Sequence, residues 1–180
     1  MSYRNRQFWQ PDVTVATVVN RNGLLLMVEE QVAGLAVFNQ PAGHLEPDES
    51  ILDAAVRETL EETGWQVALN AIIGAYQWKS AETGKQYLRM AFAADPVRHQ
   101  PERILDEGII AAHWLSPAEI EALADRHRSP LVWRVLQDYK AEKKILTEEP
   151  IEDGIMLFSK AGEMVKPLEA NAQPMLEAAE

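Results

Sequence analysis

The sequence predicts a single α/β domain, an α/β/α sandwich in which helices cover both faces of a mixed β-sheet. A chain of 180 residues is long enough for one domain with a full hydrophobic core and is short for two. Stretches with strand-like alternation are separated by stretches whose apolar residues recur at helical spacing. Strands and helices in this mixed order are typical of a sheet layered between helices.

The chain is expected to enter the sheet through a hairpin. In residues 13–19, Val and Thr alternate with Thr, Ala and Val, which predicts a strand with apolar residues on both faces. Asn22-Gly23 is a signal for a tight turn, and residues 24–28 are predicted to form the returning strand. The segment 38–48 contains two prolines and a glycine and is expected to be a loop.

A helix is predicted over residues 51–63. Ser50 is its expected N-cap, in a capping-box relation with Asp53, and Gly64 stands where a left-handed residue would end it. Two strands, 72–79 and 86–93, are expected around a turn at 82–84, and a short strand at 111–115.

Two more helices complete the predicted domain. Ser116 is expected to cap the first, with Pro117 at its first position, and the second follows Ser129-Pro130 and runs to about residue 144. We therefore expect a domain at 1–146. Residues 147–180 are acidic and less patterned, and they predict a tail with weak local structure.

Composition excludes several kinds of site and partner. The chain has no cysteine, which excludes a disulfide framework, a thiolate metal site and a cysteine nucleophile. A formal net charge of −11 disfavours binding to a nucleic-acid polymer. The sequence shows neither a signal peptide nor an apolar run long enough to span a membrane, so we expect a cytoplasmic protein, monomeric or homodimeric, with no membrane partner.

The predicted helix 51–63 carries three acids on one side. Glu58, Glu61 and Glu62 stand at spacings of three and four residues. Three carboxylates within one turn repel one another, but a hard divalent cation such as Mg²⁺ would bind them. Such a pattern is also common on a solvated helix face, and the helix alone favours that plainer interpretation. Its apolar side is expected to hold Leu52, Val56, Thr59, Leu60 and Thr63.

The loop before the helix changes the balance. From the loop into the helix, the fixed positions read Gly43, five residues, Glu49, seven residues, Arg57-Glu58, two residues, Glu61-Glu62, one residue, Gly64. This pattern resembles the Nudix box, the signature of the Nudix hydrolase superfamily. Seven fixed positions give a chance match on the order of one in 10⁸ to 10⁹ per starting point, from ordinary residue frequencies. Thr59 and Trp65 stand where the box normally has aliphatic residues, and both positions concern packing rather than chemistry.

The resemblance extends beyond the box, over about residues 11–140, and there it is similar to the NudJ-type phosphatase branch of the superfamily. The most distinctive piece is the segment Pro41-Ala42-Gly43-His44-Leu45-Glu46. Further matches are the segments 13–19, 28–30, 39–40, 77–78, 88–89 and 128–132. The branch implies hydrolysis of nucleoside di- and triphosphates and of thiamine-type diphosphates, with release of phosphate.

The resemblance also implies a metal centre. Glu58, Glu61 and Glu62 would be metal ligands, with Mg²⁺ as the cofactor or Mn²⁺ in its place. One of them, or a carboxylate outside the box, would orient or deprotonate the attacking water. The backbone carbonyl of Gly43 would add a ligand. Arg57, counted with the catalytic residues, would pair with Glu49 or Glu61.

A further acid is expected from the loop before the last strand, as in many family members. Asp106 and Glu107 lie there, and Glu107 is the candidate metal ligand, although Gly108 stands at the position expected of the acid.

Four residues are candidates for binding the small phosphorylated metabolite. Arg89 on its strand and His44 beside Gly43 would contact phosphate. Trp78 and Phe38 would stack on a heterocycle. Each has a plainer alternative: a solvated arginine, a hydrogen bond within the loop, or core packing for the two aromatic side chains.

The sequence thus predicts a Mg²⁺-dependent hydrolase of phosphoanhydride bonds in small phosphorylated metabolites, releasing phosphate. Two alternatives stay open at this point. One is a Nudix pyrophosphohydrolase that cuts between the α and β phosphates of a nucleotide or dinucleotide. The other is a non-catalytic Nudix domain that senses a ligand, and the complete set of fixed box residues argues against it.

Overall fold

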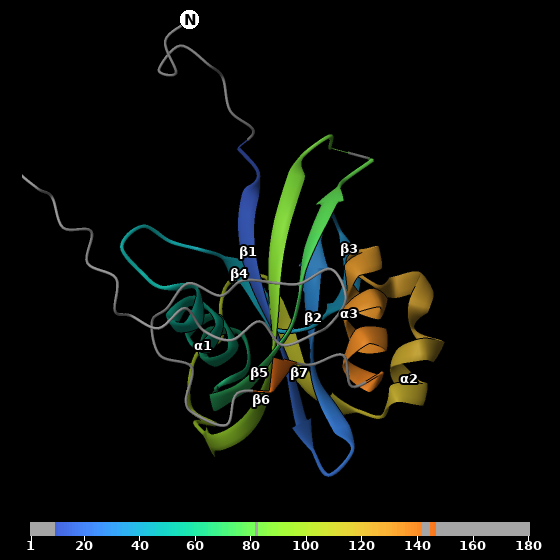
Figure 1. The fold of residues 1–180 in the computed structure, drawn as a ribbon. Helices are drawn as coiled ribbons and strands as arrows, with labels where there is room; N and C mark the ends of the chain where they lie inside the picture. Colours follow the sequence, from blue (N-terminus) through green and yellow to red (C-terminus); the bar gives the residue numbers. More distant parts are fainter. Residues whose placement is uncertain (1–9, 82, 142–144, 147–180) are drawn as a thin grey trace, which may run out of the picture.

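The computed structural model describes residues 10–81, 83–141 and 145–146. Its described part has three layers (Figure 1). Helix α1 (Ile51–Thr63) covers one face of the sheet, and α2 (Pro117–Ala122) and α3 (Pro130–Lys140) cover the other. The expected α/β/α sandwich with a mixed sheet is confirmed. None of the helices in the described ranges is long and apolar enough to cross a membrane.

Within the described ranges, eight strands form one connected sheet. They are β1 (Asp12–Arg21), β2 (Leu24–Val32), β3 (Leu35–Asn39), β4 (Ala42–His44), β5 (Trp65–Lys79), β6 (Gln86–His99), β7 (Ile109–Leu115) and β8 (Ile145–Leu146). The order is β3-β2-β1-β6-β5-β8, with β4 paired to β1 and β7 paired to β2. Strands β1 and β6 run parallel, and the other described pairs are antiparallel.

Several predicted bounds change. The segment 38–48, expected to be a loop, contains the end of β3 and all of β4, on either side of Pro41. Both strands are short, and each is stabilised by pairing with a longer strand: β3 pairs with β2, and β4 pairs with β1. The local sequence pattern does not indicate such pairing. Strand β5 begins at Trp65 rather than residue 72, and β6 continues to His99. Helix α3 ends at Lys140, before the predicted end near 144. The predicted tail lies outside the described residues.

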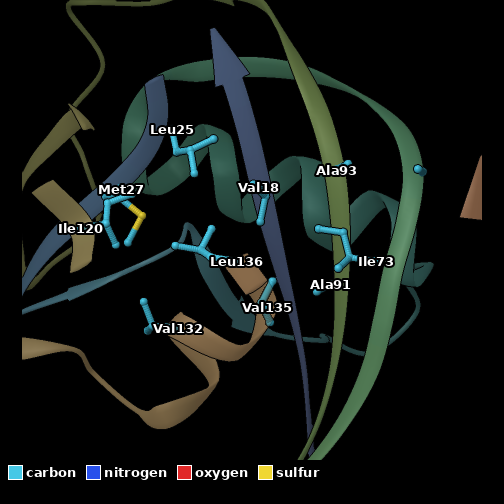
Figure 2. Close-up of a cluster of buried hydrophobic side chains, with 11 residues drawn as sticks. Val18, Leu25, Met27, Ile73, Ala91, Ala93, Ile120, Val132, Val135 and Leu136 are labelled. Carbon is cyan, nitrogen blue, oxygen red and sulfur yellow. The ribbon is translucent and has the colours of Figure 1, made fainter. Parts of the chain in front are cut away.

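Strand β1 is apolar on both faces, as predicted, because helices pack on both. Val15 packs in a cluster with Ala54 and Ala55 of α1. Val18 belongs to the opposite cluster, with Val132 of α3 (Figure 2). Figure 2 shows side chains from β1, β2, β5, β6, α2 and α3 meeting in that second cluster. Burying each Val or Leu stabilises the fold by roughly 1.5–3 kcal/mol.

The two unusual box positions are explained by packing. Thr59 faces Thr17 of β1, and their hydroxyl oxygens lie 2.7 Å apart in a buried hydrogen bond. The polar group that replaces an aliphatic side chain is therefore satisfied. Trp65 meets Trp114 edge to face with 5.4 Å between ring centroids. The Arg21 guanidinium carbon lies 4.1 Å from the centroid of the Trp114 ring, so the strand ends are held by aromatic and cation–π contacts.

Candidate active site

Helix α1 is fixed at both ends. The Ser50 hydroxyl accepts a hydrogen bond from the Asp53 backbone N–H at 3.1 Å and donates one to the Asp53 carboxylate at 2.8 Å. Gly64 adopts the left-handed conformation, with φ of 71°, and its N–H donates to the Leu60 carbonyl. The predicted N-cap and C-terminal glycine are therefore confirmed, and the acids between them are held in a fixed register.

The buried face of α1 differs from the expected apolar side. The buried residues are Ala54, Ala55, Glu58, Thr59, Glu62 and Thr63. The expected apolar residues Leu52, Val56 and Leu60 are only half-buried. Two acids are buried because β4 packs against their side of the helix, where the Ala42 N–H donates to Glu62 Oε2 at 2.8 Å. The helical period alone could not predict that these acids are buried, since the residues that cover them belong to β4, outside the helix.

Gly43 makes room for Glu58. A Cβ atom at position 43 would lie 2.2 Å from the Glu58 carboxyl group, far inside van der Waals contact. Only glycine therefore lets β4 approach the helix this closely.

Arg57 ties the acids together. Its guanidinium donates to both carboxylate oxygens of Glu49, at 2.9 and 2.7 Å. It also donates to Glu58 and to Glu61, each at 2.9 Å. The His44 backbone carbonyl accepts a further bond at 3.0 Å. The expected pairing of Arg57 with Glu49 or Glu61 thus occurs with both, and Arg57 lowers the pKa of Glu49.

Three carboxylates converge next to this arginine. Oxygen atoms of Glu58, Glu61 and Asp106 all lie within 4.8 Å of one another. The loop that carries Asp106 is anchored to the helix, because the Asp106 backbone N–H donates to the Glu61 backbone carbonyl at 3.1 Å. Glu107, the acid singled out from the sequence, is exposed and does not belong to this group. The loop therefore supplies an acid as expected, but from the preceding position.

Burial makes two of the α1 acids, Glu58 and Glu62, harder to ionise. Burial raises the pKa of Glu58, and the nearby charges of Glu61 and Asp106 raise it further, against the effect of Arg57. Burial also raises the pKa of Glu62, to about 8. A divalent cation would reverse this penalty by compensating the clustered negative charge. The donor set consists of carboxylate oxygens, the ligands that Mg²⁺ and Mn²⁺ accept, so these residues fit such a metal.

A cavity of about 450 Å³ opens beside the acids. It is lined by Thr14, Glu30, Asn39, Ala42, Gly43, His44, Glu46, Glu58, Glu62, Trp78, Ser80, Thr83, Tyr87, Arg89, Arg128, Ser129 and Leu131. Of the residues chosen from the sequence, His44, Trp78 and Arg89 reach this cavity. Its size lies within the range of pockets for small ligands.

Phe38 does not reach the cavity. Consecutive side chains of a strand point to opposite faces, and the next residue, Asn39, takes the cavity side. The Phe38 ring is 6% exposed and packs under Arg126, whose guanidinium carbon lies 4.7 Å from the ring centroid. The structure therefore gives Phe38 the core-packing role that the sequence left as its alternative.

Arg89 is a half-buried cation in the cavity wall. Its polar contacts are long, at 3.5 Å to Thr14 Oγ1 and 3.5 Å to Asn39 Oδ1. Burial lowers its pKa to about 10, while Glu30 and Glu62 oppose that change. A guanidinium that lines the cavity and has only these long hydrogen bonds is suited to bind a phosphate or other anion.

Four wall residues lie in segments that resemble the NudJ branch but were not predicted to be site residues. Glu30, Asn39, Arg128 and Ser129 come from strands β2 and β3 and from the start of α3. Glu30 follows Glu29 within β2, and Arg128-Ser129 precedes α3. The spacing of these residues along the chain does not indicate that their side chains meet in one cavity. Their convergence depends on tertiary pairing.

Comparisons with known proteins agree with this geometry. Residues 9–134 match the family model described as NUDIX domain. The chain is 39% identical over 136 residues to a protein called Phosphatase NudJ from Escherichia coli K12, covering 76% of this chain and 88% of the relative.

Among solved structures, a NUDIX hydrolase from Nitrosomonas europaea is 46% identical and superposes with a TM-score of 0.72, over 73% of this chain and 90% of the other. A bifunctional NMN adenylyltransferase/ADP ribose pyrophosphatase from Francisella tularensis, complexed with AMP and a manganese ion, has a TM-score of 0.58 at 21% identity. The superposition covers 78% of this chain and 44% of that protein, and at this identity it shows similarity of fold alone.

Proposed function

This chain belongs to the Nudix hydrolase family, and from that premise we propose that it is a Mg²⁺-dependent phosphatase of small phosphorylated metabolites. The enzyme hydrolyses phosphoanhydride bonds. The proposed substrates are nucleoside tri- and diphosphates and thiamine-type diphosphates, with release of phosphate. The name of the relative Phosphatase NudJ supports this choice of product.

One observation carries the proposal. Glu58 belongs both to the carboxylate group with Glu61 and Asp106 and to the wall of the cavity that contains Arg89. Negative groups that could hold a divalent cation therefore adjoin a cavity with a cation of its own. A phosphate chain needs both, because its charge must be neutralised and its atoms aligned.

Glu58, Glu61 and Asp106 would hold the metal, with Glu62 beside them. When bound, Mg²⁺ would neutralise phosphate charge and make the attacking water more acidic. Arg57 positions the acids by its bonds to Glu58 and Glu61.

The cavity side chains would bind the metabolite. Arg89 would hold phosphate oxygens, and His44, whose side chain is 65% exposed at the cavity rim, would contact the outer part of the phosphate chain. Trp78 would lie against the organic group. One of the clustered carboxylates would orient or deprotonate the water.

A substrate panel tests the proposal. Purified enzyme is incubated with nucleotides, dinucleotides and thiamine-type diphosphates, in Mg²⁺, in Mn²⁺ or in excess chelator, and products are identified by mass. We expect phosphate release that needs the metal. Turnover that survives the chelator would contradict the metal assignment, and nucleoside monophosphate with pyrophosphate would indicate the alternative pyrophosphohydrolase.

A further inference from the structure

The wall of the cavity contributed by β2, β3 and the start of α3 carries polar groups that the proposed phosphate chemistry does not use. Glu30 comes from β2, Asn39 from β3, and Arg128 and Ser129 directly precede α3. We call Glu30 and Ser129 the edge-reading pair. Each has one buried side-chain oxygen that has no hydrogen-bond partner among the described residues.

Glu30 has one oxygen left over. The Asn39 side chain hydrogen-bonds this carboxylate, and Arg128 Nε lies 3.8 Å from Oε1, beyond hydrogen-bond distance. Oε1 is buried and has no hydrogen-bond partner within the described ranges. Such an atom lies ready to accept a hydrogen bond from a ligand in the cavity.

The Ser129 hydroxyl is also buried without a hydrogen-bond partner among the described residues. It precedes α3, where serine often caps a helix, yet its side chain makes no capping bond. The residue is 8% exposed, and its buried hydroxyl has no partner in the described part of the chain. A serine hydroxyl can donate as well as accept, so the edge-reading pair places an acceptor and a donor in the wall of one cavity.

We propose that the edge-reading pair selects a heteroaromatic ring that carries an exocyclic amino group next to a ring nitrogen. The inference rests on the proposed function, because the phosphates of the same molecule would lie toward Arg89 and Glu58. The amino group donates to Glu30 Oε1, and the Ser129 hydroxyl donates to the adjacent ring nitrogen. Cytosine and adenine present this edge.

Keto rings present the opposite pattern. Uracil and hypoxanthine place a carbonyl oxygen where cytosine and adenine have the amino group. That oxygen would meet the Glu30 carboxylate acceptor to acceptor, so the hydrogen bond to Glu30 is not made, although the Ser129 hydroxyl can turn to accept from the protonated ring nitrogen. Sites built around a buried hydrogen bond discriminate strongly against ligands that lack it.

Binding of matched ligands tests the inference without turnover. Calorimetry with Mg²⁺ present measures the Kd of cytidine and uridine triphosphates whose bridging oxygens are methylene groups, and of the adenosine and inosine pair. We expect the amino-bearing member of each pair to bind at least about tenfold more tightly. In Glu30→Gln, whose amide can donate to a carbonyl, the preference should shrink to less than about threefold or reverse.

Glu29→Gln is the matched control. Glu29 is the adjacent acid of β2, but it does not line the cavity; it accepts bonds from Arg126 at 2.8 Å and is paired with His113 at 3.1 Å. This variant should keep the wild-type preference. Equal binding within both pairs by the wild-type enzyme would overturn the inference, as would an unchanged preference in a folded Glu30→Gln. If that variant does not fold, the wild-type ratios decide alone.

Turnover separates the two proposals. Hydrolysis without amino preference refutes the edge-reading pair and leaves the phosphatase standing. Selective binding without hydrolysis refutes the phosphatase and supports the pair.

Discussion

Single residues of this site matter because the fold holds acids closer together and deeper than an isolated helix would. Glu58 and Glu62 are each only 9% exposed, although glutamate side chains usually lie in solvent. The pKa of Glu62 is raised to about 8 by burial. Groups with such perturbed pKa values are concentrated at functional sites.

Replacing Glu62 by Gln should separate function from stability. Gln can still accept the Ala42 N–H, which Glu62 accepts at 2.8 Å, but it carries no charge. We expect kcat/KM to fall at least ~100-fold, or ~2.7 kcal/mol in barrier, with no loss of thermal stability. Glu121→Gln on the exposed side of α2 is the control. Near-normal turnover in Glu62→Gln would show that the charge of Glu62 is not needed for hydrolysis.

The loop acid can be identified by two neighbouring substitutions. Asp106 lies in the carboxylate group and Glu107 does not. We expect Asp106→Asn to raise the Mg²⁺ concentration for half-maximal activity by at least about tenfold, since even substitutions of residues that only support metal ligands weaken metal binding by roughly 10–100-fold. Glu107→Gln should leave it unchanged. The reverse result would restore Glu107, the original candidate, and remove Asp106.

Among single residues, the sequence predicted the acids of α1 and three residues that line the cavity, His44, Trp78 and Arg89, but it chose Glu107 instead of Asp106 and placed Phe38 at the ligand. Glu58, Glu61, Glu62 and their arginine stand within one helix, so spacing alone brings them together. Asp106 reaches the group only through the loop anchored on Glu61, and Phe38 misses the cavity because strand pairing turns Asn39 inward. Such one-residue differences depend on tertiary register.

Among the elements, α1 depends most on how its ends are fixed. Gly64 ends the helix with φ of 71°, and a Cβ atom there would lie 2.9 Å from the Gln100 carbonyl oxygen. Gly84 has the same φ of 71° in an open turn, with nothing within 4 Å. Replacing Gly84 therefore tests backbone strain alone, whereas replacing Gly64 tests the same strain together with a steric clash.

Gly64→Ala and Gly84→Ala should differ in cost. Left-handed backbone costs an alanine roughly 1–2 kcal/mol relative to glycine, so Gly84→Ala should lower the free energy of unfolding by about 1 kcal/mol. Gly64→Ala should lower it by about 2 kcal/mol or more, since the Gln100 carbonyl must also move. Urea denaturation of both variants measures the difference. Equal losses would show that contact with Gln100 does not constrain the helix end.

The elements that were predicted well have local signals, and those that were missed do not. Ser50, Gly64, Ser116 and Pro117 mark helix ends through caps that the structure contains. Strands β3 and β4 are short and are ordered by their partners. The N-terminal part of β5 was missed because its register shifts at bulges, which break the alternation.

For the whole molecule, the described domain contains the complete candidate site. Family similarity covers residues 9–134, and β8 (Ile145–Leu146) is the last described element, paired with Ala71 and Ile72 of β5. The sequence predicted the layers because helical and strand periods follow one another clearly. The boundary at 146 remains a prediction.

A truncated chain tests that boundary. We expect residues 1–146 to fold with a cooperative thermal transition and to retain hydrolysis, because the acidic composition of 147–180 is poorly suited to building a core. Circular dichroism melting and turnover are measured against the full chain. Insolubility, or loss of the cooperative transition, would show that the tail belongs to the domain or to an oligomer interface.

The most direct test of the whole account is the bond that is broken. A nucleoside triphosphate is incubated with enzyme and Mg²⁺ in heavy-oxygen water, and the products are weighed by mass over time. We expect orthophosphate carrying the heavy oxygen together with unlabelled diphosphate first, and monophosphate later, since sliding the phosphate chain by one unit changes which phosphorus meets the water. Pyrophosphate as the initial product, with no diphosphate intermediate, would contradict the account.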